Sequence, residues 1–465
     1  MKTQCTLALL AFAAASQPSH SADLLEVYQQ ALQSDPLIRE AEANRLASEE
    51  LMPQARGLLL PQITATAFEQ RSESEGDNLF QQQIIDPVTE EVTGIINVTA
   101  PFEDRNNEFS QWELQLTQTV FNWQQIAGLQ QANKRVAEAQ VTYESAQQSL
   151  LLRVAERYFD VLAAEDSLEA SSANREAIAK QLDQSQKRFE VGLIAITDVQ
   201  ESQAAFDQAV ADEIAAKRTL ATANYLLTEI TGVPVSDLAE PTGEIPLESP
   251  QPAVEEDWVR LALEQNLDLV AGRINAEVAS KEVSVRQGAR LPTLDLIVSR
   301  RNQESTGERS NAGSDFFPTA FGSDQESIAL QFSVPVFTGM RNGSRVKEAV
   351  YLHRAARERV QRLARETERL ARDSYLGVLT EISRTKALQQ ALRSAETALE
   401  ATQAGFEVGT RTTVDVLDAQ RNLFNARTQF LRARYDYLLN VLRLKQAAGN
   451  LRVQDLEKIN GLLGS

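Results

Sequence analysis

The chain carries one structural plan twice, and this duplication constrains its fold more than any other feature. The clearest match joins FEVGLIAITDV, at residues 189–199, to FEVGTRTTVDV, at residues 406–416. The stretch that begins at Ala31 aligns with the one that begins at Ala262, and QLTQTVF in the first half aligns with QFSVPVF in the second. An internal repeat of this kind marks a repeated structural unit. Each half predicts the order helix, strand, strand, long helix, helix.

The duplication divides the chain into five segments. We predict a signal peptide at residues 1–22, a first repeat at 23–231, a linker at 232–256, a second repeat at 257–448 and a C-terminal segment at 449–465. The linker is rich in proline, glycine and acidic residues, which break helices. We expect the linker and the C-terminal segment to lie together at mid-height, as an equatorial region of a long molecule.

The first residues predict export from the cytoplasm. Lys2 precedes an apolar stretch from Leu7 to Ala15 that is too short to span a bilayer, and small residues follow. Cleavage after Ala22 is one interpretation, and cleavage between Ala13 and Ser16 is the alternative. The single cysteine lies in this segment, so we expect a mature chain without disulfides, thiolate metal sites or a lipid anchor.

Three of four predicted strand segments alternate clearly between apolar and polar residues, as in Trp112, Leu114 and Leu116. The predicted strands cover about residues 62–71, 109–121, 293–301 and 326–337. Period-two alternation suits a barrel with lipid outside and water inside, although an ordinary half-buried sheet shows it too. Long polar loops predicted at 71–108 and 302–325, with phenylalanines in or beside them, favour the barrel. Since no apolar run of about 18 residues follows the signal, we expect any membrane crossing to use β-strands.

Four strands cannot close a barrel, because the smallest barrels need about eight, so we expect a homo-oligomer. Two copies would give eight strands with a packed interior, and three copies would give twelve with a lumen. Proline-free stretches at about 122–191 and 338–408 predict helices about 105 Å long at 1.5 Å per residue. Half-length helices at about 23–58 and 197–231 would stack end to end beside them. Together these helices predict the wall of a tube.

The composition argues against several classes of function. A net charge of −19 argues against nucleic acid as a partner, because phosphate binding needs basic surface. The mature chain offers at most His353 as a histidine, with no phosphate-binding glycine loop and no metal-ligand cluster. We therefore expect no enzyme, no cofactor and no metal site. A periplasmic coiled-coil spacer and a stand-alone porin remain alternatives to a duct.

The two repeated motifs predict helix-turn-helix tips. Gly192 and Gly409 each follow a valine at the end of a long helix, where glycine can take the left-handed conformation that ends it. Thr197 with Gln200, and Thr412 with Asp415, have the spacing of a helix N-cap and its partner. Asp415 also lies three residues before Asp418, on one helix face. Helix capping alone would account for these residues, whereas several copies around an axis would form an acidic constriction.

With both turn motifs in view, the chain resembles the TolC family of outer-membrane exit ducts over nearly its whole mature length. Further residues that carry the resemblance are the LP pairs that open each hairpin, Tyr158 and Tyr375, and the late NYLLTEITG and DYLLNVLRLKQAAG segments. The resemblance implies a mainly α protein with a membrane β-barrel portion. It implies a trimer with a twelve-stranded barrel in the outer membrane and a long α-helical tunnel in the periplasm. It also implies a periplasmic adaptor and an inner-membrane transporter as partners in efflux pumps or type I protein secretion.

The resemblance also assigns roles at the tips. It implies that Asp415 and Asp418 form the narrowest ring of the periplasmic entrance, and that Arg411, with Thr197 and Asp198, holds it shut. Further residues at the tips match the expected docking site of the adaptor. They are Val191, Gly192, Leu193, Val408, Gly409 and Thr410.

One residue departs from the family pattern at the entrance. Phe406 stands where the family has a tyrosine that hydrogen-bonds to the matching aspartate. A phenylalanine cannot make this bond, so we expect closure to depend more heavily on Arg411.

Overall fold

The computed structural model describes residues 21–243, 245–311 and 314–464. These residues form two units. A helical unit contains residues up to 46, 138–273 and the chain from 358 on, and a sheet unit contains residues 47–137 and 274–357. The predicted signal peptide lies outside the described residues, except for its last two positions.

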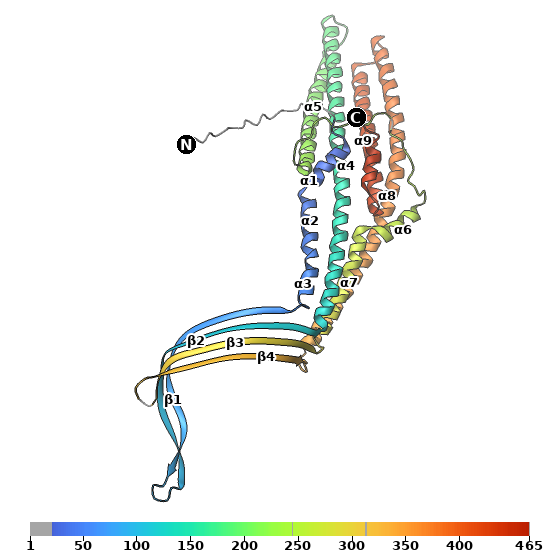
Figure 1. Ribbon diagram of the computed structural model, residues 1–465. Helices are drawn as coiled ribbons and strands as arrows, with labels where there is room; N and C mark the ends of the chain where they lie inside the picture. The colour runs from blue at the N-terminus through green and yellow to red at the C-terminus, as the bar shows by residue number, and fades with distance from the viewer. Residues whose placement is uncertain (1–20, 244, 312–313, 465) are drawn as a thin grey trace, which may run out of the picture. The chain divides into compact units, whose positions relative to one another are not determined.

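The sheet unit holds four antiparallel strands in the order β1-β2-β3-β4. They are β1 (Gln62–Ile85), β2 (Val92–Asn122), β3 (Thr293–Asn311) and β4 (Phe317–Ser333). Each repeat supplies one hairpin, and pairing of β2 with β3 joins the two hairpins into one sheet (Figure 1). Within the described chain, the outer edges of β1 and β4 have no strand partner.

The strand register gathers the alternating residues onto separate faces. One cross-strand row runs through Ile63, Leu116, Val298 and Ile328 and is apolar throughout. The neighbouring row, on the opposite face, runs through Thr64, Gln115, Ser299 and Ser327 and is polar. Ile328 is 79% exposed, and Leu330 and Phe332 on the same strand are exposed as well. The predicted alternation is confirmed, and its apolar face is uncovered in a single chain.

The strands extend much further than predicted. Most of the expected loop at 71–108 continues the β1–β2 hairpin, with Phe80 opposite Val98 and a turn at residues 86–91. Strand β3 meets β2 only as far as Phe102, so the outer part of this hairpin is a two-stranded ribbon (Figure 1). The expected loop at 302–325 is also mostly paired. The loop prediction was wrong because alternation reveals a strand only where one face is apolar, and in this outer part both faces mix polar and apolar residues.

Ten helices occur in the described residues. They are α1 (Leu24–Ser34), α2 (Pro36–Glu49), α3 (Leu51–Gly57), α4 (Trp123–Glu190), α5 (Ile196–Thr231), α6 (Glu255–Gln265), α7 (Leu267–Gly288), α8 (Arg341–Glu407), α9 (Thr413–Ala447) and α10 (Val453–Asn460). The two long helices are confirmed, with 68 residues in α4 and 67 in α8. None of the described helices is both long and apolar enough to cross a membrane.

The predicted half-length helix at 23–58 is broken into α1, α2 and α3. At the first break, Asp35 leaves the helical conformation before Pro36, and its carboxylate accepts a hydrogen bond from the Leu37 amide at 2.7 Å. Asn266 makes the same break between α6 and α7 and accepts from the Leu269 amide at 3.0 Å. The two repeats therefore share a break that helix periodicity did not reveal.

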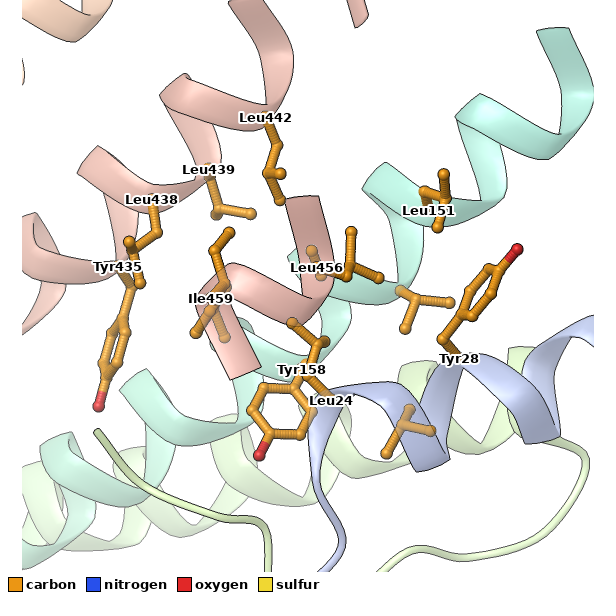
Figure 2. Packing of buried hydrophobic residues seen from close by; sticks show 14 of the residues in the cluster. Leu24, Tyr28, Leu151, Tyr158, Tyr435, Leu438, Leu439, Leu442, Leu456 and Ile459 are labelled. Carbon is orange, nitrogen blue, oxygen red and sulfur yellow. The ribbon is translucent and has the colours of Figure 1, made fainter. Parts of the chain in front are cut away.

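The core of the helical unit lies where α1, α4, α9 and α10 meet (Figure 2). Tyr158 and Tyr435 are its largest fully buried side chains, and Phe159 lies between them at ring distances of 5.7 and 5.5 Å. The linker and the C-terminal segment meet beside this core, where the Thr242 amide donates to Leu462 O at 3.0 Å.

The linker and the N-terminal segment are held by tyrosine hydroxyls. Tyr158 Oη donates to Ala239 O at 2.7 Å, and Tyr375 Oη in the second repeat donates to Ala253 O at 2.6 Å. Burial raises the pKa of Tyr158, so it remains a protonated donor. Tyr158 also donates to Ala22 O at 3.2 Å, and Ala22 itself is buried. Cleavage after Ala22 would remove this acceptor from the mature protein.

We expect Gly449→Ala to destabilise the helical unit strongly. Gly449 has a φ of 75°, and an added Cβ would lie 2.1 Å from Gln265 O. Strain and overlap together should cost about 3 kcal/mol or more. Gly409→Ala is the matched control, because its φ is 78° and an added Cβ meets no atom within 4 Å; it should cost about 1 kcal/mol. Thermal unfolding followed by circular dichroism measures both, and equal losses would contradict the steric explanation.

Candidate functional site: the tips of the helical hairpins

Two helical hairpins end in tight turns, one between α4 and α5 and one between α8 and α9. Gly192 and Gly409 have φ values of 75° and 78°, in the left-handed region that favours glycine. The Leu193 amide donates to Arg188 O at 2.9 Å, and the Thr410 amide donates to Gly405 O at 2.8 Å. These bonds satisfy carbonyl groups at the helix ends. The prediction that both glycines end long helices is confirmed.

The start of α9 has the predicted capping box. The Asp415 amide donates to Thr412 Oγ1 at 3.2 Å, and the Thr412 amide donates to Asp415 Oδ2 at 2.9 Å. These hydrogen bonds from Thr412, with the nearby charge of Arg411, hold the pKa of Asp415 below its usual value. Asp415 is therefore ionised throughout the physiological pH range.

The start of α5 differs from the prediction that Thr197 and Gln200 form the cap. The helix begins at Ile196, and Ala195 is its N-cap. Asp198 accepts from the Ala195 amide at 3.2 Å, but alanine has no side-chain oxygen to return the bond. The first repeat keeps only half of the box, and the prediction was wrong because the helix starts two residues earlier than the threonine suggests.

The second predicted acid is paired within its own chain. Asp418 Oδ1 accepts from Arg421 Nη2 at 2.6 Å, and both side chains are more than half exposed. Asp415 and Asp418 are thus both engaged, one in a cap and one in an ion pair. The sequence prediction missed Arg421, although its spacing of three residues after Asp418 is a recognised signal of a helical ion pair.

Phe406 is buried at the tip of the second hairpin, with 7% of its surface exposed. The guanidinium of Arg188, near the end of α4, lies 4.4 Å from the centre of its ring. A cation–π contact of this kind contributes about 0.5–1 kcal/mol at an exposed site. The two hairpins of one chain are therefore joined at their tips by a contact that needs no tyrosine hydroxyl. Nothing in the sequence links Arg188 to Phe406, because their pairing arises only in the folded chain.

Arg411, Thr197 and Asp198 are not brought together within one chain. In the described part of the molecule, the Arg411 guanidinium forms no hydrogen bond or ion pair, and the Asp198 carboxylate accepts from the Ala195 amide. Arg411 and Thr197 are exposed, and Asp198 is half-buried.

Helices α4 and α9 run antiparallel and are joined by a ladder of polar contacts. Its rungs are Glu156 with Arg443 at 2.7 Å, Asp160 with Arg432 at 2.9 Å, Asp166 with Tyr435 at 2.8 Å and Glu169 with Arg427 at 3.2 Å. The rung nearest the tips is Glu169 with Arg427. The tips themselves present apolar side chains to solvent, with Val191, Leu193 and Val408 at least 70% exposed.

The model of the family described as "Outer membrane efflux protein" matches residues 27–233 and 258–450, which are the two repeats. The chain belongs to this family. It is accordingly a protein of the bacterial outer membrane, and the family is one of efflux channels rather than of enzymes.

Relatives extend this likeness over nearly the whole chain. Outer membrane protein TolC of Escherichia coli is 36% identical over 453 residues, which cover 96% of this chain and 86% of that protein. The alkaline protease secretion protein AprF of Pseudomonas aeruginosa is 29% identical, with 94% of this chain and 86% of that protein covered.

Solved structures show the same fold. The outer membrane protein VceC of Vibrio cholerae has a TM-score of 0.71 at 20% identity and covers 92% of this chain and 96% of its own. The CmeC outer membrane channel of Campylobacter jejuni has a TM-score of 0.72 at 15% identity and covers 100% and 98%. The expected fold class, a helical part with a strand portion, is confirmed.

The complete cap of α9 and the incomplete cap of α5 predict opposite effects of two substitutions. Thr412→Ala should weaken the start of α9 by about 1 kcal/mol, because it removes the acceptor for the Asp415 amide. Ala195→Ser should strengthen the start of α5 by about as much, because it completes the box with Asp198. Hydrogen exchange of the amides at each tip measures local opening. The capping explanation fails if Ala195→Ser leaves exchange at the first tip unchanged.

Proposed function

We propose that three copies of this chain form an outer-membrane exit duct for efflux pumps or type I secretion systems. The observation that carries the proposal is the match of the family model to both repeats of a chain whose sheet has an exposed apolar face and two open edges. Sheet edges expose unpaired N–H and C=O groups, which lipid cannot satisfy. Pairing β4 of one copy with β1 of the next would close the sheet and cover every edge.

Three copies suit the sheet better than two. Eight strands leave an interior that side chains fill, whereas twelve leave a lumen. The polar face, with Gln115, Ser299 and Ser327, would line that lumen, and the apolar face would meet lipid. The helices of each copy would form one third of a tunnel wall in the periplasm.

The hairpin tips would form the closed entrance of the tunnel. Asp415 and Asp418 from each copy would surround the axis, and Arg411 would bind Thr197 and Asp198 of a neighbouring copy. Among the described residues the Arg411 guanidinium forms no hydrogen bond or ion pair, although its charge lies near Asp415, and this supports the assignment. The contact of Phe406 with Arg188 would hold the two hairpins of one copy together, so closure would not depend on Arg411 alone.

A periplasmic adaptor and an inner-membrane transporter would open the entrance. The exposed apolar residues around Gly192 and Gly409, with Thr410, supply the surface that we assign to the adaptor. Outward movement of the tips would widen the acidic ring. This movement would leave the α4–α9 ladder intact. Glu169 and Arg427, which form its contact nearest the tips, lie several helical turns away from Gly192 and Gly409.

The cargo follows from the transporter that the duct serves. Names among the relatives include an efflux protein of Brucella suis and the proteases secretion protein PrtF of Dickeya chrysanthemi. A single duct could therefore pass small molecules, proteins or both.

Planar-bilayer recording of the purified, detergent-extracted protein tests the duct directly. We expect small single-channel currents that favour cations, and restored resistance to toxic compounds when the chain is expressed in a strain that lacks its own exit duct. A protein that is soluble without detergent and forms no channel would be a coiled-coil spacer. Large currents without any partner would indicate a stand-alone porin.

Arg411→Ala with Asp198→Ala should raise single-channel conductance severalfold, because it removes the proposed link between copies. Arg427→Ala is a matched control, since it removes an arginine that pairs with Glu169 in its own chain. Unchanged conductance in the double variant, with normal trimer yield, would contradict the assigned closure.

A further inference from the structure

Arg421 lies beside the acidic pair of the proposed entrance. Its guanidinium donates to Asp418 at 2.6 Å, and it follows Asp418 by three residues on the same helix. Any movement that carries Asp418 toward the axis of the duct therefore carries Arg421 with it. Exposed ion pairs add little to stability, but their charges persist whatever the side-chain geometry.

The first repeat shows what this position looks like without the arginine. Alignment of the two turn motifs places Asp198 over Asp415, Glu201 over Asp418 and Ala204 over Arg421. Both repeats thus carry two acids at the start of the helix, but only the second adds a positive charge one turn later. The arginine is not needed for the helix-turn-helix fold, because the first tip forms without it.

We infer that Arg421 sets the ion selectivity of the duct by neutralising part of the acidic charge at its entrance. The inference rests on the proposed constriction. Three copies would bring six carboxylates and three Arg421 guanidiniums within about 9 Å of one another along the helix direction. The Debye length is about 10 Å at 0.1 M salt, so a guanidinium in contact with Asp418 acts on every ion that passes the acidic ring.

Other charges near the ring do not replace this role. Arg411 lies before Asp415, but in the closed entrance it would be balanced by Asp198 of a neighbouring copy. Arg427 lies nine residues beyond Asp418, about 13.5 Å further along the helix and thus more than a Debye length away, and pairs with Glu169 at 3.2 Å. Arg421 is therefore the cation that pairs directly with a carboxylate of the acidic ring.

The permeability ratio of K⁺ to Cl⁻, taken from reversal potentials in a KCl gradient, tests the inference. Arg421→Ala should raise this ratio severalfold and strengthen block by a polyvalent cation such as hexamminecobalt. Arg427→Ala removes the same charge farther from the ring and should leave the ratio unchanged. Asp415→Asn with Asp418→Asn should lower the ratio, and asparagine at 415 retains an oxygen that can accept from Thr412.

The outcomes separate this inference from the proposed function. If the double asparagine variant lowers the ratio and Arg421→Ala does not raise it, the role of Arg421 is overturned and the constriction stands. Equal increases in Arg421→Ala and Arg427→Ala would show a general effect of charge, and would also overturn the inference. If neither the double asparagine variant nor Arg421→Ala changes the ratio, the constriction itself is elsewhere.

Discussion

The outer edges of β1 and β4 carry backbone N–H and C=O groups without a strand partner in the described chain, and the architecture of the protein depends on how these groups are satisfied. The uncovered apolar face of this four-stranded sheet is unfavourable in water. Its two open edges are unfavourable in lipid, because lipid cannot satisfy their unpaired N–H and C=O groups. Only closure by further copies satisfies both faces and both edges at once. Closure of the sheet requires an oligomer, and the oligomer in turn encloses the lumen and the tunnel.

The two repeats break and cap their helices at corresponding positions, but with different residues. Asp35 and Asn266 break the helices at corresponding places, and each caps the helix that follows. The tips diverge more, because Thr412 completes a capping box that Ala195 leaves half made. The second tip also has Arg421 where the first has Ala204, and its Phe406 is buried whereas the aligned Phe189 is exposed. The chemistry of the proposed entrance is therefore concentrated in one repeat, although both repeats share the fold.

Much of the fold could be predicted from the sequence, because its signals are local. Long proline-free stretches gave α4 and α8, and glycine after valine gave both turns. The outer half of the β1–β2 hairpin could not be predicted, since alternation needs one apolar face. The start of α5 was misplaced because Thr197 has the spacing of a cap without being one. The contact of Arg188 with Phe406 joins residues far apart in the sequence, and only folding brings them together. The entrance ring and its closure remain proposals.

The number of copies in the detergent-extracted particle tests whether three chains close the sheet into a barrel. Native mass spectrometry of the purified protein, with the detergent removed in the gas phase, measures this number without a functional assay. We expect three copies, because twelve strands close the sheet around a lumen. A particle of one copy would leave the sheet edges open, and a particle of two would fill the lumen. Either result would contradict the duct.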